Sequence, residues 1–205
     1  MPADEPECTV RRARTRDVRA IRALVDAYAP DRRLLSKATV TLYEDVQEFW
    51  VAERDGRVLG CGALHVMWED LAEVRTVAVV ANAHGQGIGS GLLRQLIEHA
   101  RELGVRRLFC LTFETDFFAR HGFSPVDDVP VELTVQAELL RSPDEGVAEF
   151  LDLERVKPNT LGNTRMLALL DPAAEQRAGC VRSLARSCNC NDLRRTTCLL
   201  SLLTP

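Results

Sequence analysis

Hydrophobic residues recur at two different spacings along the first 170 positions, and these spacings predict an alternation of helices and strands. Two early helices are predicted by apolar sets at helical spacing, one made of Ile21, Leu24, Val25 and Tyr28 and one, over 36–46, of Val40, Tyr43 and Val46. Thr15 is expected to cap the first helix, and Asp17 to lie in its positive first turn.

Strand-like runs surround these helices. A short strand is expected over 8–12. Residues 49–53 and 58–65 flank the pair Asp55-Gly56, which suits a tight reversing turn and so predicts a β-hairpin. A third strand of this meander is predicted over 71–80. Its TVAVV run is apolar enough for a central strand that is covered on both faces.

A helical crossover follows the third strand. An amphipathic helix is predicted over 87–103, and it makes the strands at 71–80 and 107–113 parallel neighbours. A short helix over 115–121 and a last strand over 164–170 complete the predicted elements, while 124–160 shows no clear period. The expected fold class is therefore α/β, with a mixed, mostly antiparallel central sheet between two layers of helices.

Length and charge narrow the class of protein. The chain has 205 residues and a formal net charge of −4, which fits one domain with an extension and argues against a nucleic-acid partner. No apolar run approaches the ~18 residues that cross a bilayer, so no membrane partner is expected. The acidic, polar start MPADEPEC shows no secretory signal, and the expected location is the cytoplasm.

The composition changes near Asp171-Pro172. We interpret 1–170 as the folded domain and 171–205 as a weakly ordered tail rich in Cys and Arg. Four of the seven cysteines lie in this tail, where Cys188-Asn-Cys190 lacks the spacing of a zinc half-site. No metal site is expected.

The feature that points to chemistry is the segment HGQGIGSG at 84–91, which has four glycines in seven residues. It lies between an apolar strand and an amphipathic helix. Glycines there leave backbone N–H groups uncovered at a helix N-terminus, which favours a bound phosphate over a turn needed for packing alone. The segment lacks the Gly-Lys-Ser/Thr ending of a nucleoside-triphosphate loop, and its glycines do not fit a dinucleotide-binding turn.

Segment 84–89 resembles the Q/R-x-x-G-x-G/A motif of the GCN5-related N-acetyltransferases (GNAT), with His84 in place of the usual Arg or Gln. The resemblance covers about 8–170. Four segments are similar to the acetyltransferase domain of N-acetylglutamate synthases, in a short stand-alone form: EFWVAERDGRVLGCGALHV, AEVRTVAV, RRLFCLTFETDFFARHGF and VKPNTLGNTRML. The resemblance implies acetyl-CoA as cosubstrate and a GNAT sheet that splays at the acetyl-CoA site.

The resemblance also implies roles for residues. Glu73 matches the catalytic glutamate, which would remove a proton from the acceptor amine. Thr115 approximately matches a hydroxyl donor to the leaving thiolate, and Glu114 stays an alternative. The residues expected at acetyl-CoA are Val77, Ala78, Val79, His84, Gly85, Gln86, Gly87, Ile88, Gly89 and Ser90.

Acceptor recognition calls for cations, because a buried carboxylate needs cationic or several N–H partners. Only two of the 26 basic residues are lysines, Lys37 and Lys157, and both fall in segments that the resemblance places near the acceptor. Arg75 shares a strand face with Glu73 by alternation. Thr76 and Arg165 complete the predicted acceptor residues, each of which could instead be an ordinary surface group.

The sequence thus predicts transfer of the acetyl group of acetyl-CoA to the α-amino group of L-glutamate, with L-glutamine open, as the first step of arginine biosynthesis. Two alternatives remain: a GNAT enzyme with another amine acceptor, and a non-catalytic acyl-CoA sensor. The expected partner is a small amino-acid substrate, and a homodimer is left open.

Overall fold

A computed structural model describes residues 8–28, 38–128, 131–151 and 163–170 of the chain. Its centre is a seven-stranded sheet in the order β1-β2-β3-β4-β5-β7-β6, in which only the pair β4–β5 is parallel. The strands are β1 (Thr9–Arg12), β2 (Phe49–Arg54), β3 (Arg57–Trp68), β4 (Leu71–Val79), β5 (Arg107–Thr112), β6 (Ser124–Pro125) and β7 (Thr164–Leu169).

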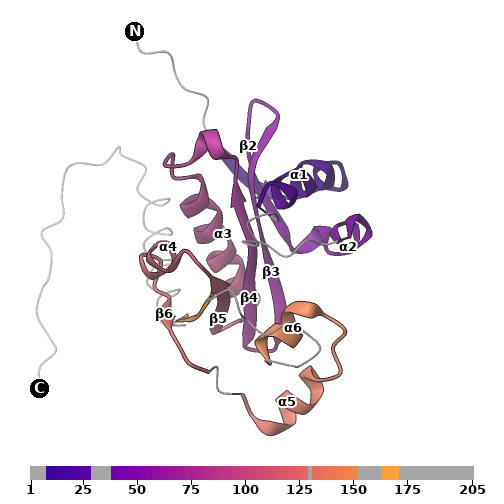
Figure 1. Cartoon of the computed structure of the whole chain (residues 1–205), viewed down its shortest axis with the longest axis vertical. Coiled ribbons are helices and arrows are strands. Elements are labelled where there is room, and N and C mark those ends of the chain that lie inside the picture. The colour runs from indigo at the N-terminus through magenta and orange to yellow at the C-terminus, as the bar shows by residue number, and fades with distance from the viewer. Residues whose placement is uncertain (1–7, 29–37, 129–130, 152–162, 171–205) are drawn as a thin grey trace, which may run out of the picture. The chain divides into compact units, whose positions relative to one another are not determined.

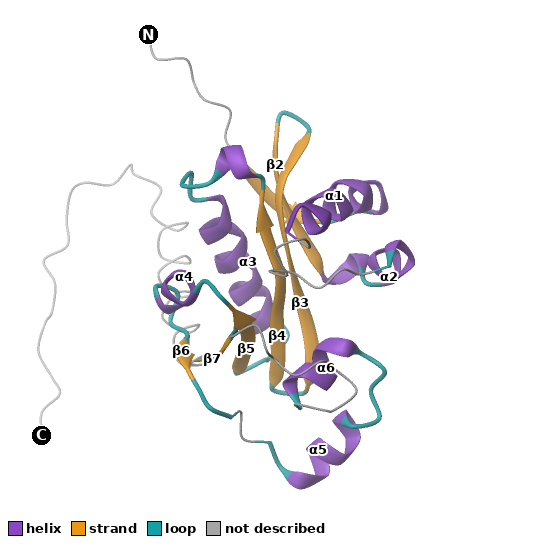
Figure 2. Cartoon of the chain, in the orientation of Figure 1, coloured by secondary structure: helices purple, strands orange, loops and turns teal. Residues whose placement is uncertain are grey.

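Helices cover both faces of this sheet (Figures 1 and 2). The helices are α1 (Val18–Tyr28), α2 (Thr39–Glu44), α3 (Ile88–Glu102), α4 (Thr115–Ala119), α5 (Leu133–Leu139) and α6 (Glu145–Phe150). Figure 1 shows α1, α2 and α6 on one face, and α3 and α4 on the other. The predicted three-layer α/β arrangement is therefore confirmed. In the described ranges, no helix is long and apolar enough to cross a membrane.

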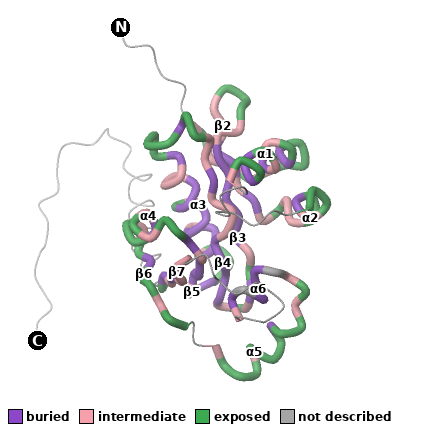
Figure 3. Tube along the Cα trace, viewed as in Figure 1, coloured by how far each residue is buried: buried purple, intermediate pink, exposed green. Residues whose placement is uncertain are grey.

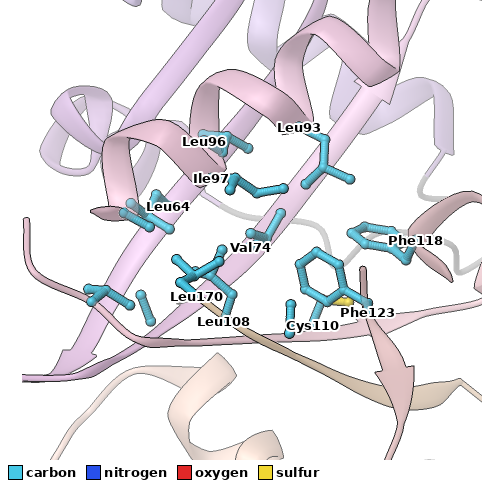
Figure 4. Packing of buried hydrophobic residues seen from close by; sticks show 14 of the residues in the cluster. Leu64, Val74, Leu93, Leu96, Ile97, Leu108, Cys110, Phe118, Phe123 and Leu170 are labelled. Carbon is cyan, nitrogen blue, oxygen red and sulfur yellow. The ribbon is translucent and has the colours of Figure 1, made fainter. Parts of the chain in front are cut away.

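Apolar clusters on each face hold the layers together. On the α3 face, Leu93 and Leu96 pack with Leu64, Val74 and other buried side chains of the sheet (Figure 4). On the opposite face, one cluster joins α1 and α2 to β2 and β3, and another joins α5 and α6 to the ends of β3, β4 and β5. The sheet is accordingly the most buried layer in Figure 3, as expected for a strand run that is apolar on both faces.

The predicted hairpin is present. Asp55 and Gly56 both have positive φ, +52° and +73°, as a two-residue turn between antiparallel strands requires. β3 continues three residues beyond the predicted His65 end, to Trp68, and pairs with β4 to complete the meander.

Two details of the early helices differ from the prediction. α2 covers only 39–44, and it buries Leu42, whereas Val40 and Tyr43 are 61% and 43% exposed. A helix of fewer than two turns is too short for spacing alone to identify its buried side. Thr15 is not the cap either: Arg14 precedes the turn, and its N–H donates to Asp17, whose carboxylate also pairs with Arg11.

The sheet opens between its two parallel strands. β4 and β5 pair only from Leu71–Arg107 to Glu73–Phe109, although β4 runs on to Val79. Beyond that point, β4 carries a bulge: Cys61 pairs with Ala78 and Ala63 with Arg75, so two β4 residues oppose one β3 residue. The predicted splaying of the sheet is confirmed, and it begins directly after Glu73.

Candidate active site

A cavity of about 570 Å³ lies in this opening. Its wall comes from the end of β4, the glycine turn, the end of β5, α4 and the last residue of α1. The lining residues are Tyr28, Val77, Ala78, Val79, Ala83, His84, Gly85, Gly87, Ile88, Gly89, Ser90, Thr112, Glu114, Phe117, Phe118 and Arg120. Nine of the ten residues predicted to contact acetyl-CoA are in this set. The exception is Gln86, whose amide oxygen accepts from Arg54 and whose amide nitrogen donates to the carbonyl of Asn82.

The glycine turn has the backbone conformation of an anion cradle. Gly85 and Gly87 have φ of +77° and +78°, and Gly87 precedes the first residue of α3. A Cβ built on either glycine would have no neighbour within 4 Å. The space beside these two residues is therefore open, so a phosphate oxygen can approach the N–H groups at the start of α3.

His84 and Tyr28 meet at the carbonyl of Val79. The Tyr28 hydroxyl donates to this oxygen at 2.5 Å, and His84 Nε2 lies 2.9 Å from it and 2.7 Å from the hydroxyl. The Val79 carbonyl oxygen is thus within hydrogen-bond distance of two side chains that line the cavity.

Glu73 lies at the fork where β4 and β5 separate. Its side chain is 5% exposed, and its strand neighbours are His65 on β3 and Phe109 on β5. A Cβ built on Gly146 of α6 would fall 2.9 Å from Glu73 Oε2 and 3.0 Å from Arg75 Nη1. Glu73 and Arg75 therefore share the face that α6 covers, as strand alternation predicts. Glu73 is beside the cavity, not among the residues that line it.

Arg75 is held by carboxylates. Its Nη1 donates to both oxygens of Asp144, at 3.1 and 3.0 Å, and its Nη2 lies 3.5 Å from Glu48. Burial acts to raise the pKa of Asp144, but the Arg75 charge and the Val147 N–H outweigh it, so that this pKa lies below its usual value. The predicted acceptor cation is thus already paired with protein acids.

Two further residues of this polar group escaped the sequence prediction. His65 Nδ1 lies 2.7 Å from Glu48, and His65 is the cross-strand neighbour of Glu73. Nothing in the local sequence shows which β3 residue opposes which β4 residue, so the sequence alone does not place His65 beside Glu73. The extension of β3 past His65 and the bulge in β4 together set this register.

The end of β5 offers a hydroxyl to the cavity. Thr112 is 8% exposed, lines the cavity, and its Oγ1 accepts the N–H of Glu114, which lines the cavity as well. Thr115 is the first residue of α4 and is not part of the lining. Thr112 is therefore a second donor candidate, beside the Thr115 that the resemblance indicates.

The remaining predicted acceptor residues do not belong to the polar group around Arg75, or they lie outside the described residues. Thr76 has φ of +58°, rare for a β-branched residue, and it forms the bulge itself. Arg165 lies on β7, opposite Leu111 of β5 and two strands from β4. Lys37 and Lys157 lie outside the described residues. Among the described residues, no three His, Cys, Asp or Glu side chains form a metal-binding group.

Comparison with known proteins agrees with this geometry. Residues 18–123 match the Acetyltransferase (GNAT) family. The chain is 59% identical over 164 residues to the amino-acid acetyltransferase of Mycobacterium tuberculosis, a match that covers 78% of this chain and 94% of that protein. It is 34% identical over 126 residues to the amino-acid acetyltransferase of Aeromonas salmonicida, of which the match covers 28%.

Two solved structures are similar as well. The crystal structure of Rv2747 from Mycobacterium tuberculosis, in complex with CoA and NLQ, has a TM-score of 0.77 and 58% identity, and the match covers 80% of this chain and 99% of that one. The N-acetylglutamate synthase of Neisseria gonorrhoeae, complexed with coenzyme A and N-acetyl-glutamate, has a TM-score of 0.65 and 26% identity, over 82% of this chain and 36% of that one. The split sheet, the glycine turn and these matches together establish that the chain belongs to the GNAT acetyltransferase family.

Proposed function

We propose that this chain transfers the acetyl group of acetyl-CoA to the α-amino group of a free amino acid, L-glutamate first and L-glutamine second. The main support for this proposal is the arrangement at Glu73. β4 and β5 separate directly after this buried glutamate, and the cavity lies in the opening between them. The similar proteins named amino-acid acetyltransferase support a free amino acid as acceptor. In this role the chain would catalyse the first step of arginine biosynthesis in the cytoplasm, and we assign the activity to residues 1–170.

The chemistry of the cavity lining suits acetyl-CoA. The turn from His84 to Ser90 offers main-chain N–H groups to the pyrophosphate, and the open space at Gly85 and Gly87 admits it. Val77 to Val79 form the cavity wall along β4, where a pantetheine arm would lie between β4 and β5. Bound acetyl-CoA supplies the activated acetyl thioester. As the resemblance implies, a backbone N–H near Val77 would donate to the thioester oxygen as it gains charge.

Glu73 is proposed to accept the proton of the acceptor amine, directly or through a water. An amino acid carries an ammonium group at pH 7, which cannot attack a thioester until it loses a proton. We further propose that His65, the strand neighbour of Glu73, and Glu48, which contacts His65, orient the acceptor or receive this proton next.

Thr112 is proposed to donate to the leaving sulfur. Its hydroxyl accepts from the Glu114 N–H, which leaves the hydroxyl proton free to point toward the cavity. Thr115, the residue that the resemblance indicates, stays a prediction. A comparison of Thr112→Val with Thr115→Val separates the two assignments.

CoA release from acetyl-CoA, measured against a panel of single amino acids, tests the function. We expect L-glutamate to give the highest kcat/KM and L-glutamine the next. Turnover with another amine but with no amino acid would replace the acceptor in the proposal. Tight acetyl-CoA binding with no turnover for any acceptor would indicate a sensor.

A further inference from the structure

We infer that Asp144 is an internal competitor for the acceptor: its carboxylate occupies the place on Arg75 that the α-carboxylate of the amino acid takes during the reaction. Asp144 would then set the affinity of the enzyme for its acceptor. The inference rests on the proposed function and extends it to a specificity-determining residue.

The first support is the state of the Arg75 guanidinium. The side chain is 10% exposed and permanently charged, so it needs an anionic partner in this position. Asp144 reaches it through Nη1 alone, and Glu48 lies 3.5 Å from Nη2. Within the described ranges, Nε and Nη2 are buried and make no hydrogen bond. A carboxylate that bridges two guanidinium nitrogens makes a stronger, bidentate pair. The Arg75 guanidinium therefore binds Asp144 but still has N–H groups that could donate to a further carboxylate.

The second support is the spacing between Arg75 and the proposed base. Glu73 Oε2, Arg75 Nη1 and Asp144 Oδ1 all lie within 3.0 Å of one point, the position of a Cβ on Gly146. The Glu73 oxygen and the Arg75 nitrogen are thus within about 6 Å of each other. The amine and the carboxylate of an α-amino acid are bonded to the same carbon. A ligand that binds Arg75 through its α-carboxylate therefore brings its amine to Glu73.

The third support is that Asp144 is held in place without Arg75. Its Oδ1 accepts the Val147 N–H at 2.9 Å, which caps the start of α6, and its own N–H donates to the Ser142 hydroxyl at 3.2 Å. A ligand can therefore take over the Arg75 contact while Asp144 keeps its cap. The Asp144 charge then remains beside the ligand carboxylate and weakens its binding by like-charge repulsion.

The test uses Asp144→Asn in the full chain, because Asn caps helices about as well as Asp but carries no charge. We expect KM to fall about three- to tenfold for both L-glutamate and L-glutamine, which share the α-carboxylate, with the change in KM rather than in kcat. L-isoglutamine, whose α-carboxyl is an amide, should show no such fall. Glu138→Gln on α5, which removes an acid paired only with Arg141 among the described residues, is the matched charge control and should leave KM unchanged.

A double-mutant cycle makes the assignment specific. In an Arg75→Gln background, KM should be raised for both acceptors, and adding Asp144→Asn should no longer lower it. An unchanged or raised KM in Asp144→Asn would overturn the inference, and so would a fall that persists without Arg75 or that is confined to L-glutamate.

The inference about Asp144 can also be tested if the proposed function is wrong. If the wild-type chain releases no CoA with any acceptor, calorimetry of L-glutamate with the wild type and with Asp144→Asn decides the inference. Tighter binding by Asp144→Asn supports the competitor, and equal affinity overturns it.

Discussion

On the side of the split sheet that we propose for the cofactor (the cofactor side), the groups offered to a ligand belong to the main chain. On the side that we propose for the acceptor (the acceptor side), they belong to charged side chains. The cofactor side is a continuous piece of sequence, from Val77 to Ser90, shaped by two glycines with positive φ. The acceptor side assembles Glu48, His65, Glu73, Arg75 and Asp144, which come from β3, β4, a single 3-10 turn (Val46–Glu48) and the segment before α6.

The difference shows what each ligand demands. A phosphate group needs several N–H donors at a helix start, and one short segment can supply all of them. An amino acid needs a proton acceptor for its amine and a cation for its carboxylate a few ångströms apart. Glu73 and Arg75 both lie on β4, but the side chains around them, Glu48, His65 and Asp144, come from other segments. The acceptor side therefore depends on packing between distant segments, and substitutions there should act selectively on the chemistry.

The largest expected effect is on the acceptor side. Glu73→Gln should lower kcat by ~10²–10⁴-fold, because it removes the proposed base. The affinity for acetyl-CoA, measured by calorimetry, should stay at the wild-type value, and the acidic limb of the pH–rate profile should disappear. Glu98→Gln on the outer surface of α3 is the control. Wild-type turnover in Glu73→Gln would remove this residue from the mechanism.

The next effect is on the cofactor side. Gly87→Val should weaken acetyl-CoA binding by about 100-fold or more, because its side chain would fill the open space beside the turn and disfavour φ of +78°. Gly104→Val is the matched control. Gly104 has φ of +83° and no neighbour within 4 Å of a Cβ, but it follows the end of α3, far along the helix from the turn. Equal losses of acetyl-CoA affinity in both variants would mean that backbone strain, and not the site, is responsible.

A smaller effect is expected where the two sides meet. Thr112→Val should lower kcat by about 10-fold while acetyl-CoA affinity is kept, since one hydrogen bond to the leaving sulfur is lost. Thr115→Val, on the helix surface beside it, should change kcat less. The reverse order would assign the donor to Thr115, and a poor-leaving-group analogue of acetyl-CoA would enlarge whichever effect is genuine.

The smallest effect concerns stability. Because the folded-state pKa of Asp144 lies below its ordinary value of 3.8, its ion pair stabilises the fold above that pH, and the contribution is lost as pH falls through the folded pKa. The melting temperature of Asp144→Asn should therefore drop less than that of the wild type between pH 6 and pH 3, by about 1–3 °C. Identical drops would mean that the Arg75 pair adds nothing to stability.

Much of the scaffold followed from the sequence alone. The Asp55-Gly56 hairpin, the apolar central strand and the glycine turn each depend on residues next to one another in the chain, and each is present. Periodicity over a long helix such as α3 was equally informative, because fifteen residues repeat the pattern several times. Over the six residues of α2 it was not, and Leu42 rather than Val40 or Tyr43 faces the core.

Tertiary structure decided the arrangement around Glu73. Strand alternation correctly put Glu73 and Arg75 on one face, but it would continue that face to Val77. The bulge at Thr76 ends the alternation, so that Val77 packs toward the α3 face and Ala78 toward α1. Neither the bulge nor the approach of Gly146 and Asp144 to Arg75 has a local signal. A positive φ at a threonine is stabilised only by the packed sheet around it, and Asp144 lies 69 residues along the chain from the guanidinium it binds.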